Sequence, residues 1–379
     1  MTASPSTIYR ICSRCIMDTS DPEISFDSAG VCNHCHNFDR VIAPVWQPNE
    51  AGGQALEALV KRVKEECAHR DYDCIIGLSG GVDSSYLALV GKKLGLRMLA
   101  VHVDAGWNSE LAVKNIEMIV TKLGIDLHTH VVNWEEVRDL QVAFFKAALA
   151  NQDVPQDHAF FSALYAYAVK NGIRYVLSGS NYATESTMPR AWAYNAMDLR
   201  HLKAIHRQFG SGRLSTYPTV NIFQYYIYYP FIRRMKVLKP LNYLPYNKEE
   251  AIRTLQQELG WRYYGGKHFE SRFTKFQQVY YRPVKFGYDE RRAYLCSLIL
   301  SEQLSREQAL EQIAQPVYAS DRDLKEDRAF VLKKLRLSED EFNMIMRLPN
   351  RTYRDYPSNA ALFGFKDRIK QWLRPTAAN

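Results

Sequence analysis

Short apolar runs and amphipathic segments alternate between residue 73 and about residue 180. The apolar runs predict strands buried on both faces, because such strands carry continuous rather than alternating apolar residues. Between the runs, apolar residues recur three and four positions apart, as in helices that pack one face on a sheet. The predicted strands are 74–76, 97–104, 127–132 and 175–178, and the predicted helices are 87–94, 111–123, 134–150 and 160–170. This alternation predicts an α/β domain with a parallel sheet and helices on both faces.

The flanking regions show different patterns. Apolar residues at helical spacing predict a helix at 56–63, and the stretch 44–53, with its prolines and glycines, is typical of a linker. The tyrosine-rich stretch 220–231 predicts a buried helix, while stacking of its rings on bases or sugars stays open as the alternative. Further helices are predicted at 197–209, 248–259, 291–314 and 324–348. The expected units are an N-terminal module at 1–45, the α/β domain at 54–225 and a mainly helical C-terminal region at 226–379.

The charge of the chain is unevenly placed. The 379 residues carry a formal net charge of +8, and the segment 231–300 alone holds 14 Lys and Arg against 6 Asp and Glu. A basic segment threaded with tyrosines predicts an anionic partner, such as ATP, a nucleotide-linked sugar or RNA, although a solvated basic face is the alternative. No apolar run is long enough to span a membrane, and no charged and apolar leader begins the chain, so we expect a cytoplasmic protein.

Two Cys-x-x-Cys pairs lie near the N-terminus, 16 residues apart. This spacing is typical of a tetrahedral structural zinc site, in which four thiolates close the coordination shell. A small hairpin between the pairs has little core of its own and needs a metal for stability. His34 and His36 are expected to be solvent-exposed neighbours rather than ligands. The predicted zinc ligands are Cys12, Cys15, Cys32 and Cys35.

The turn after the first predicted strand carries the strongest candidate chemistry. Residues 79–85 read Ser-Gly-Gly-Val-Asp-Ser-Ser. Two adjacent glycines let the backbone approach a ligand closely, and the helix that follows points its free N–H groups at the same place, which suits a phosphate. The string matches neither a Walker P-loop nor the dinucleotide-binding fingerprint. An ordinary turn in which Asp83 or Ser84 caps the helix is the alternative.

Two further strand ends and one loop are candidates for contact with the same ligand. Because ligands of open α/β sheets bind beyond the carboxyl ends of the strands, Asp104 and the turn 178–185 are expected beside the loop 79–85. Either could instead be a plain cap or turn. Residues 265–276 combine glycines, bases and polar residues with phenylalanines. That composition favours the binding of phosphates over a place in the core.

The loop 79–85 resembles the PP-loop of the N-type ATP pyrophosphatases, the superfamily of asparagine, GMP and NAD synthetases and of the tRNA thiolases. Together with the cysteine pairs and the string Gly266-Lys-His-Phe-Glu-Ser-Arg-Phe-Thr-Lys-Phe276, the chain is similar to the N-acetyl sugar amidotransferase family of bacterial surface-polysaccharide synthesis. The resemblance implies a zinc-ribbon-like module, a HUP-like PP-loop sheet and a C-terminal, mostly helical basic region. It also implies conversion of an acetamido group of a nucleotide-activated sugar into an acetamidino group, as in lipopolysaccharide or O-antigen synthesis.

The same resemblance implies cofactors, partners and residue roles. ATP, Mg²⁺ and Zn²⁺ are the expected cofactors, and a separate glutaminase, with a cyclase-like barrel subunit, is the expected ammonia source. Asp83 takes the place of a Mg²⁺ ligand, and Glu185 takes an acidic place that departs from the Gly-His-Asn-x-x-Asp form of several relatives. The residues expected around pyrophosphate are Ser79, Gly80, Gly81, Ser84 and Ser85. Asp104 is expected near the adenosine and Gly179 near AMP, with Lys267, Arg272 and Lys275 as cations over the α phosphate.

The chemistry of the reaction agrees with these residue types. An amide oxygen is a poor leaving group, and transfer of adenylate to it makes AMP the leaving group. A tRNA-modifying thiolase is the main rival, but such enzymes generally need reactive cysteines near the loop, and a nucleic-acid partner is therefore not expected. A nucleotide-binding regulator without turnover is a third hypothesis, which the intact Ser-Gly-Gly-Val-Asp-Ser string disfavours.

Overall fold

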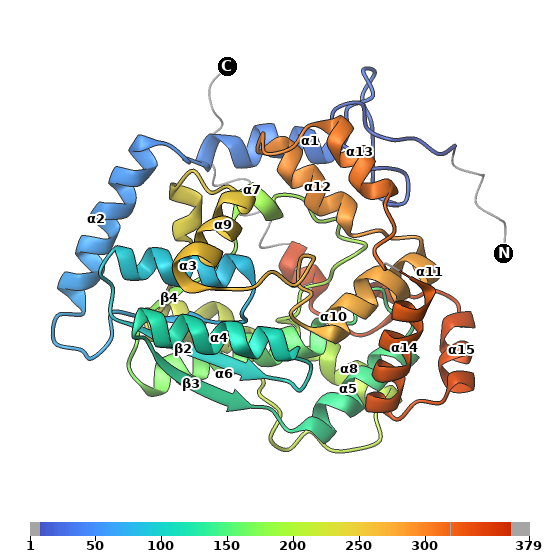
Figure 1. Ribbon diagram of the computed structural model, residues 1–379. Helices are drawn as coiled ribbons and strands as arrows, with labels where there is room; N and C mark the ends of the chain where they lie inside the picture. The colour runs from blue at the N-terminus through green and yellow to red at the C-terminus, as the bar shows by residue number, and fades with distance from the viewer. Residues whose placement is uncertain (1–7, 319, 365–379) are drawn as a thin grey trace.

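The computed structural model describes residues 8–318 and 320–364 and contains a five-stranded parallel sheet (Figure 1). The strand order is β3-β2-β1-β4-β5, with neighbouring strands paired in parallel throughout. The strands are β1 Cys74–Gly77, β2 Met98–Asp104, β3 Asp126–Val131, β4 Tyr175–Leu177 and β5 Lys236–Leu238. The first four confirm the predicted strands, and β5 is an addition from beyond residue 225 that pairs with β4.

Helices cover both faces of this sheet, as the continuous apolar runs predict. Neighbouring strand residues point to opposite faces, so Ile76 packs with the helices of one face and Ile75 with those of the other. The first face carries α2 Glu50–Glu66, α3 Val82–Lys93, α4 Glu110–Leu123 and α9 Lys248–Leu259. The second face carries α5 Trp134–Lys146, α6 Val154–Lys170 and α8 Leu199–Phe209. The predicted fold class is confirmed.

The linker predicted at 44–53 is wrong. Helix α2 begins at Glu50, and the side chain of Asn49 caps it by accepting a hydrogen bond from the backbone N–H of Gly52. A Cβ on Gly52 would lie 1.8 Å from the carbonyl oxygen of Gln47 and 2.8 Å from that of Tyr243. This glycine therefore allows close packing of α2 against neighbouring backbone, which the composition of the stretch did not reveal.

The N-terminal module packs on the C-terminal region. Its cysteine loops are followed by α1 Asn33–Asn37, η1 Phe38–Ile42 and η2 Ala43–Val45. Arg292 forms an ion pair with Asp18 at 2.9 Å, and Arg306 donates hydrogen bonds to the carbonyl oxygens of Cys12 and Cys15 at 3.0 and 3.1 Å. Two arginines from the far end of the chain thus hold the module in place.

The C-terminal region is mainly helical, as predicted, but several details differ. The predicted segments 291–314 and 324–348 each form two helices. Phe273 and Phe276 are fully buried, so the expectation that 265–276 avoids the core is wrong for these rings. The stretch 220–231 largely forms η3 Gln224–Ile232, in which only Tyr229 is buried, so the prediction of a buried helix is also wrong.

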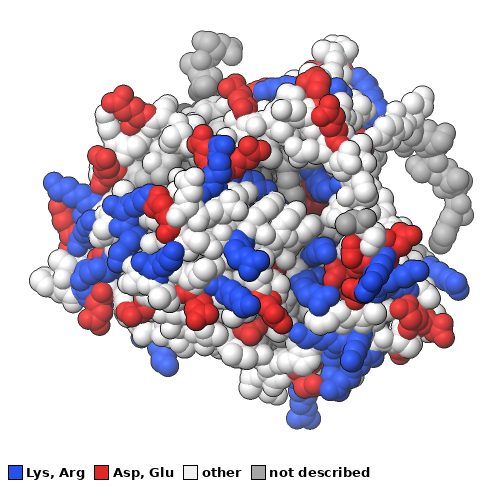
Figure 2. All heavy atoms as spheres, viewed as in Figure 1, with Lys and Arg blue, Asp and Glu red and all other residues white. Residues whose placement is uncertain are grey.

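The remaining elements complete the chain as described. They are α7 Tyr182–Glu185, η4 Pro240–Tyr243, α10 Arg272–Phe276, η5 Gln277–Tyr281, α11 Arg282–Phe286, α12 Arg291–Leu300, α13 Arg306–Ala314, α14 Asp321–Leu335, α15 Glu339–Arg347 and η6 Tyr353–Asp355. Within the described residues, no helix has both the length and the apolar character needed to cross a membrane. Lys and Arg side chains are interspersed with Asp and Glu over the face shown in Figure 2 and do not form one continuous basic surface there.

Candidate active site at the carboxyl edge of the sheet

The loop 79–85 joins β1 to α3 and presents the N-terminus of that helix. Gly80 has a φ of +80°, and a Cβ there would lie 2.7 Å from the carbonyl oxygen of Ala112 on α4. Gly81 is the N-cap of α3, and no side chain caps this end, so the interpretation of Asp83 or Ser84 as a cap is wrong. The N–H groups of Gly81 and Val82 donate to Ser79 Oγ and Tyr264 Oη at 3.2 and 3.0 Å. The N–H groups of Asp83 and Ser84 and the positive end of the helix dipole are therefore what this loop offers to an anion.

Lys267 reaches this loop from the other end of the sequence. Its Nζ lies 3.4 Å from Asp83 Oδ2 and 3.0 Å from Glu185 Oε1, and its side chain is only 7% exposed. The structure thus brings together three of the residues singled out from the sequence. Burial disfavours the ammonium, but the charges of Glu185 and Asp83 outweigh it and raise the pKa of Lys267.

Asp83 remains a carboxylate in this cluster. Burial works to raise its pKa, but the charge of Lys267 and a hydrogen bond donated by the Tyr246 hydroxyl together lower the pKa below its ordinary value. Asn181 also donates to Asp83, at 3.3 Å. Asp83 and Glu185 offer the oxygen ligands that Mg²⁺ takes in proteins, so the pair fits the implied metal in type. Their role as ligands stays a prediction.

Glu270 contacts the loop directly, and sequence reasoning missed it. Ser79 Oγ donates to Glu270 Oε1 at 3.4 Å, and a Cβ on Gly81 would lie 2.8 Å from the same oxygen. The other carboxylate oxygen of Glu270 is buried and has no hydrogen-bond partner in the described part of the chain. Segment 268–272 is held here by an isolated bridge between Asn108 and Ser271 and by a hydrogen bond from Ser109 N to the Glu270 carbonyl oxygen.

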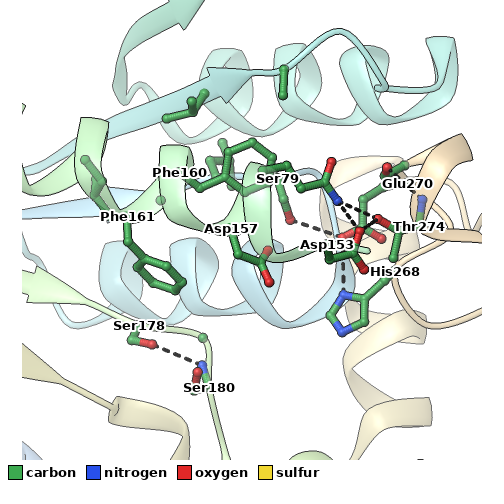
Figure 3. Close-up of a pocket in the computed structure, with 18 of the residues that line it drawn as sticks. Ser79, Asp153, Asp157, Phe160, Phe161, Ser178, Ser180, His268, Glu270 and Thr274 are labelled. Carbon is green, nitrogen blue, oxygen red and sulfur yellow. Dashed lines mark hydrogen bonds and ion pairs between the residues drawn. The ribbon is translucent and has the colours of Figure 1, made fainter. Parts of the chain in front are cut away.

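A cavity of about 470 Å³ opens where β1, β2 and β4 end (Figure 3). Its lining includes Ser79 from the loop and Gly179 after β4, two of the residues predicted to contact ATP. Phe160 and Phe161 supply apolar walls, and polar groups gather toward His268 and Glu270. An apolar cavity with a few converging polar groups beside a phosphate-type loop has the character of a nucleotide site.

Two carboxyl groups on α6 line the same cavity and were also missed. Burial raises the pKa of Asp153 to about 6, and burial together with the charge of Asp153 raises the pKa of Asp157 to about 8. Burial disfavours a charged His268, but the negative charge of Glu270, whose Oε1 lies 3.8 Å from His268 Nδ1, raises the pKa of His268 to about 9. The predicted helix begins only at 160, whereas α6 begins at Val154, with Asp153 as its N-cap and Asp157 in its first turn.

Other predicted residues have partners within the protein. Arg272 and Lys275 each form an ion pair of 2.7 Å with Asp327 on α14, so their role over the α phosphate stays a prediction. Asp104 accepts hydrogen bonds from Gly106 N and from the Asn108 side chain, at 2.7 and 3.0 Å. Asp104 thus closes a turn, whereas Ser109 is the N-cap of the next helix, α4. Contact of Asp104 with adenosine stays a prediction.

The four N-terminal cysteines meet in one buried cluster. Cys15 Sγ and Cys35 Sγ each lie 3.7 Å from Cys32 Sγ, and Cys12 Sγ lies 3.9 Å from Cys35 Sγ. A tetrahedral zinc site with Zn–S bonds of about 2.3 Å has sulfur atoms about 3.8 Å apart, so the cluster fits Zn²⁺. His36 is 40% exposed as expected, whereas His34 is only 16% exposed and contacts the buried Asp21, so the prediction of exposure is wrong for His34.

Comparisons with known proteins match two separate parts of the chain. Residues 270–370 match the family described as "LPS biosynthesis protein WbpG-like, C-terminal domain", and residues 54–200 match NAD synthase. A tRNA(Ile)-lysidine synthase of Chlamydia pneumoniae is 29% identical over 133 residues, which are 35% of this chain and 39% of that protein. The chain thus spans about two fifths of the length of this curated relative.

Two solved structures are similar over parts of the chain. An NH3-dependent NAD synthetase from Campylobacter jejuni is 18% identical, with 38% of this chain and 63% of that chain covered and a TM-score of 0.29. An NMN synthetase from Francisella tularensis is 16% identical, with 62% of this chain and 97% of that chain covered and a TM-score of 0.29.

Proposed function

This chain belongs to a PP-loop family of the N-acetyl sugar amidotransferase type, and on that premise we propose that it is an ATP-dependent amidotransferase acting on a nucleotide-activated acetamido sugar. The acetamido oxygen attacks the α phosphorus of ATP, and the bond from that phosphorus to pyrophosphate breaks. Ammonia then adds to the activated carbon and AMP leaves with the former amide oxygen. The product is an acetamidino sugar for lipopolysaccharide or O-antigen synthesis.

The observation that supports this proposal is the position of Lys267. The segment that resembles the sugar amidotransferases, 266–276, places its lysine on Asp83 and Glu185 beside the PP-loop, and its Glu270 on Ser79. The matched C-terminal domain begins at this same segment, at residue 270. A WbpG-like region that completes the ATP site favours activation of a sugar substrate over other PP-loop chemistry.

The residues of the chain act here mainly by positioning and by charge. The α3 N-terminus and the glycines hold the leaving pyrophosphate, and Lys267 stabilises negative charge that grows during transfer. Asp83 and Glu185 are the residues that would hold Mg²⁺, which would neutralise phosphate oxygens. Asp157, with a pKa of about 8, is suited to take a proton from incoming ammonium in its ionised form, which becomes the major form only above about pH 8.

We assign the ammonia supply to a separate glutaminase with its cyclase-like barrel, and the Zn²⁺ site to a structural role. ATP and reduced cysteines coexist in the cytoplasm, where we place the reaction. Modification of tRNA is the second candidate, favoured by the lysidine synthase match. A thiolase is disfavoured, because Cys74 is fully buried at the start of β1, at the opposite end of the strand from the loop, and burial raises its pKa.

The test is release of pyrophosphate and AMP from ATP in the presence of ammonium and an acetamido nucleotide sugar. Isotopically labelled ammonium should enter the sugar product, as read by mass spectrometry. The Asp83→Asn variant should keep its fold by circular dichroism and lose turnover. Strict dependence on tRNA, or formation of ADP and orthophosphate, would overturn the proposal.

A further inference from the structure

A second cavity, of about 300 Å³, adjoins the first. Asn151 and Ala193 line both cavities and form their common wall. Four segments far apart in the sequence meet around the second cavity, which are 22–23 of the cysteine module, 149–154, 190–194 and 351–354. Neither the PP-loop nor any predicted site residue contributes to it, so this cavity has no role in the mechanism above.

Three arginines line this cavity against one carboxylate, that of Glu23. Arg190 is exposed and makes no ion pair or hydrogen bond within the part of the chain that the structure describes. Arg351 reaches Asp355 only at 3.5 Å, and Arg354 reaches Glu23 at 3.3 Å, with 54% and 70% of their side chains exposed. Such weakly paired guanidinium groups are available to phosphate oxygens, which they bind through two parallel hydrogen bonds.

Aromatic rings complete the lining. Tyr353 stacks on Tyr194 with ring centres 4.3 Å apart and planes at 12°, and Trp192 stacks on Tyr288 at 5.4 Å and 21°. All four residues line the cavity. Flat aromatic faces beside arginines are the combination that binds a nucleobase together with its phosphates.

We propose that this second cavity binds the nucleoside diphosphate part of the acceptor sugar. The phosphates lie on Arg190, Arg351 and Arg354, and the base lies against the partly exposed rings of Tyr194 and Tyr353, while Trp192 is fully buried. The sugar extends past Asn151 and Ala193 toward the first cavity. This inference rests on the proposed function, because it gives that reaction its acceptor site. It also gives the cysteine module a function, since Pro22 and Glu23 form part of the wall.

A third cavity, of about 760 Å³, suits this ligand less well. It also shares wall residues with the first cavity, among them Tyr294. Of its cations, Lys267 is already assigned to the ATP reaction, and Arg291 pairs with Asp289 at 2.7 Å. Phosphates bound to Arg291 would have to compete with this carboxylate, whereas the arginines of the second cavity are weakly paired.

The test is calorimetric binding of UDP, with α,β-methylene-ATP present at saturation so that UDP cannot occupy the ATP site. Arg190→Ala and Arg351→Ala should each weaken UDP binding by about tenfold or more, since a hydrogen bond to a charged group is lost. Arg322→Ala is the matched control, because Arg322 is 85% exposed on α14 and pairs only with Glu326. That variant should bind UDP as the native chain does, and all variants should bind the ATP analogue unchanged.

Absence of UDP binding to the native chain, or binding of UDP by both cavity variants as tightly as by the native chain, would overturn the assignment. Failure of the proposed function looks different. If sugar-dependent pyrophosphate release is absent while UDP binding is lost in the two cavity variants alone, the site stands and the reaction is wrong. If release occurs with an unchanged KM for the sugar in these variants, the reaction stands and the site is wrong.

Discussion

Replacement of Lys267 by methionine separates the electrostatic role of this residue from its packing. The side chain is nearly buried and has Asp83 and Glu185 as its ion-pair partners. Methionine has a similar length but no charge, so the variant leaves two carboxylates near each other without a cation. Removing one partner of a buried ion pair costs about 3–5 kcal/mol, because the remaining charge stays desolvated.

The pH dependence of this loss follows from the pKa of Asp83. In the native chain Lys267 and Tyr246 hold that pKa below its ordinary value of 3.8, so their stabilisation is present above pH 3.8 and is lost as pH falls further. Without Lys267, burial dominates and raises the pKa of Asp83, so the variant loses stability as pH rises above 3.8. The difference in free energy of unfolding between the native chain and Lys267→Met should therefore be large at pH 7 and small near pH 4.

Urea unfolding followed by tryptophan fluorescence at the two pH values measures this difference. Lys93→Met is the matched control, because Lys93 pairs with Glu258 on the surface with 57% of its side chain exposed, and surface pairs contribute little. Pyrophosphate release should fall about 100- to 1000-fold in Lys267→Met, as for removal of other groups that stabilise transition-state charge. An equal loss of stability at pH 4 and pH 7 would refute the electrostatic reasoning and assign the loss to packing.

Three further predictions test other parts of the site. Elemental analysis should find about one zinc per chain, and Cys32→Ser or a chelator should remove it and lower the melting temperature. Gly80→Ala should destabilise the protein by about 1–2 kcal/mol or more and weaken ATP binding because φ is positive there, whereas Gly53→Ala, with open space around its Cβ in α2, should stabilise by about 0.5–1 kcal/mol. The melting temperature of Asp157→Asn should exceed that of the native chain by an amount that grows as pH rises from 3.8 to about 8. The reason is that only the native chain must keep Asp157 protonated or bury its charge, and the excess should be constant above about pH 8.

The features that the sequence predicts correctly are those set by residues close together in the chain, such as strands, the cysteine pairs and the glycine turn. Strands β1, β2 and β4 were found because they are mainly apolar runs. Strand β3 at the sheet edge alternates polar and apolar residues and was found from its place between two helical patterns. Strand β5 was missed because it has three residues and is mostly exposed at the other edge. The zinc cluster was found because two Cys-x-x-Cys pairs nearly specify their own geometry. The PP-loop was found because its turn chemistry, its glycines and its place after a strand all agree.

Residues that act across long distances in the chain could not be placed in this way. Phe273 and Phe276 looked exposed within a basic string, yet both are buried against rings of other segments, such as Phe145 and Phe342. Asp153 and Asp157 look like turn residues beside Pro155, and only the packing of α6 on the sheet shows that they line the cavity. Composition gives no information about such partners.

The proposed ATP site is assembled from two parts of the chain that are nearly 200 residues apart. Segment 268–272 is fixed beside β2 by its contacts with Asn108 and Ser109, and this places Lys267 and Glu270 on the loop. The PP-loop domain by itself would therefore have the glycine turn and helix α3 but neither the buried cation nor the nearby carboxylate. Because the C-terminal region also supplies Arg351 and Arg354 to the second cavity, its folding links the ATP site to the proposed acceptor site. If the PP-loop can adenylate a substrate only when the C-terminal region is folded beside it, ATP cleavage depends on the same region that forms the proposed acceptor site. This dependence would limit ATP cleavage to the intended substrate.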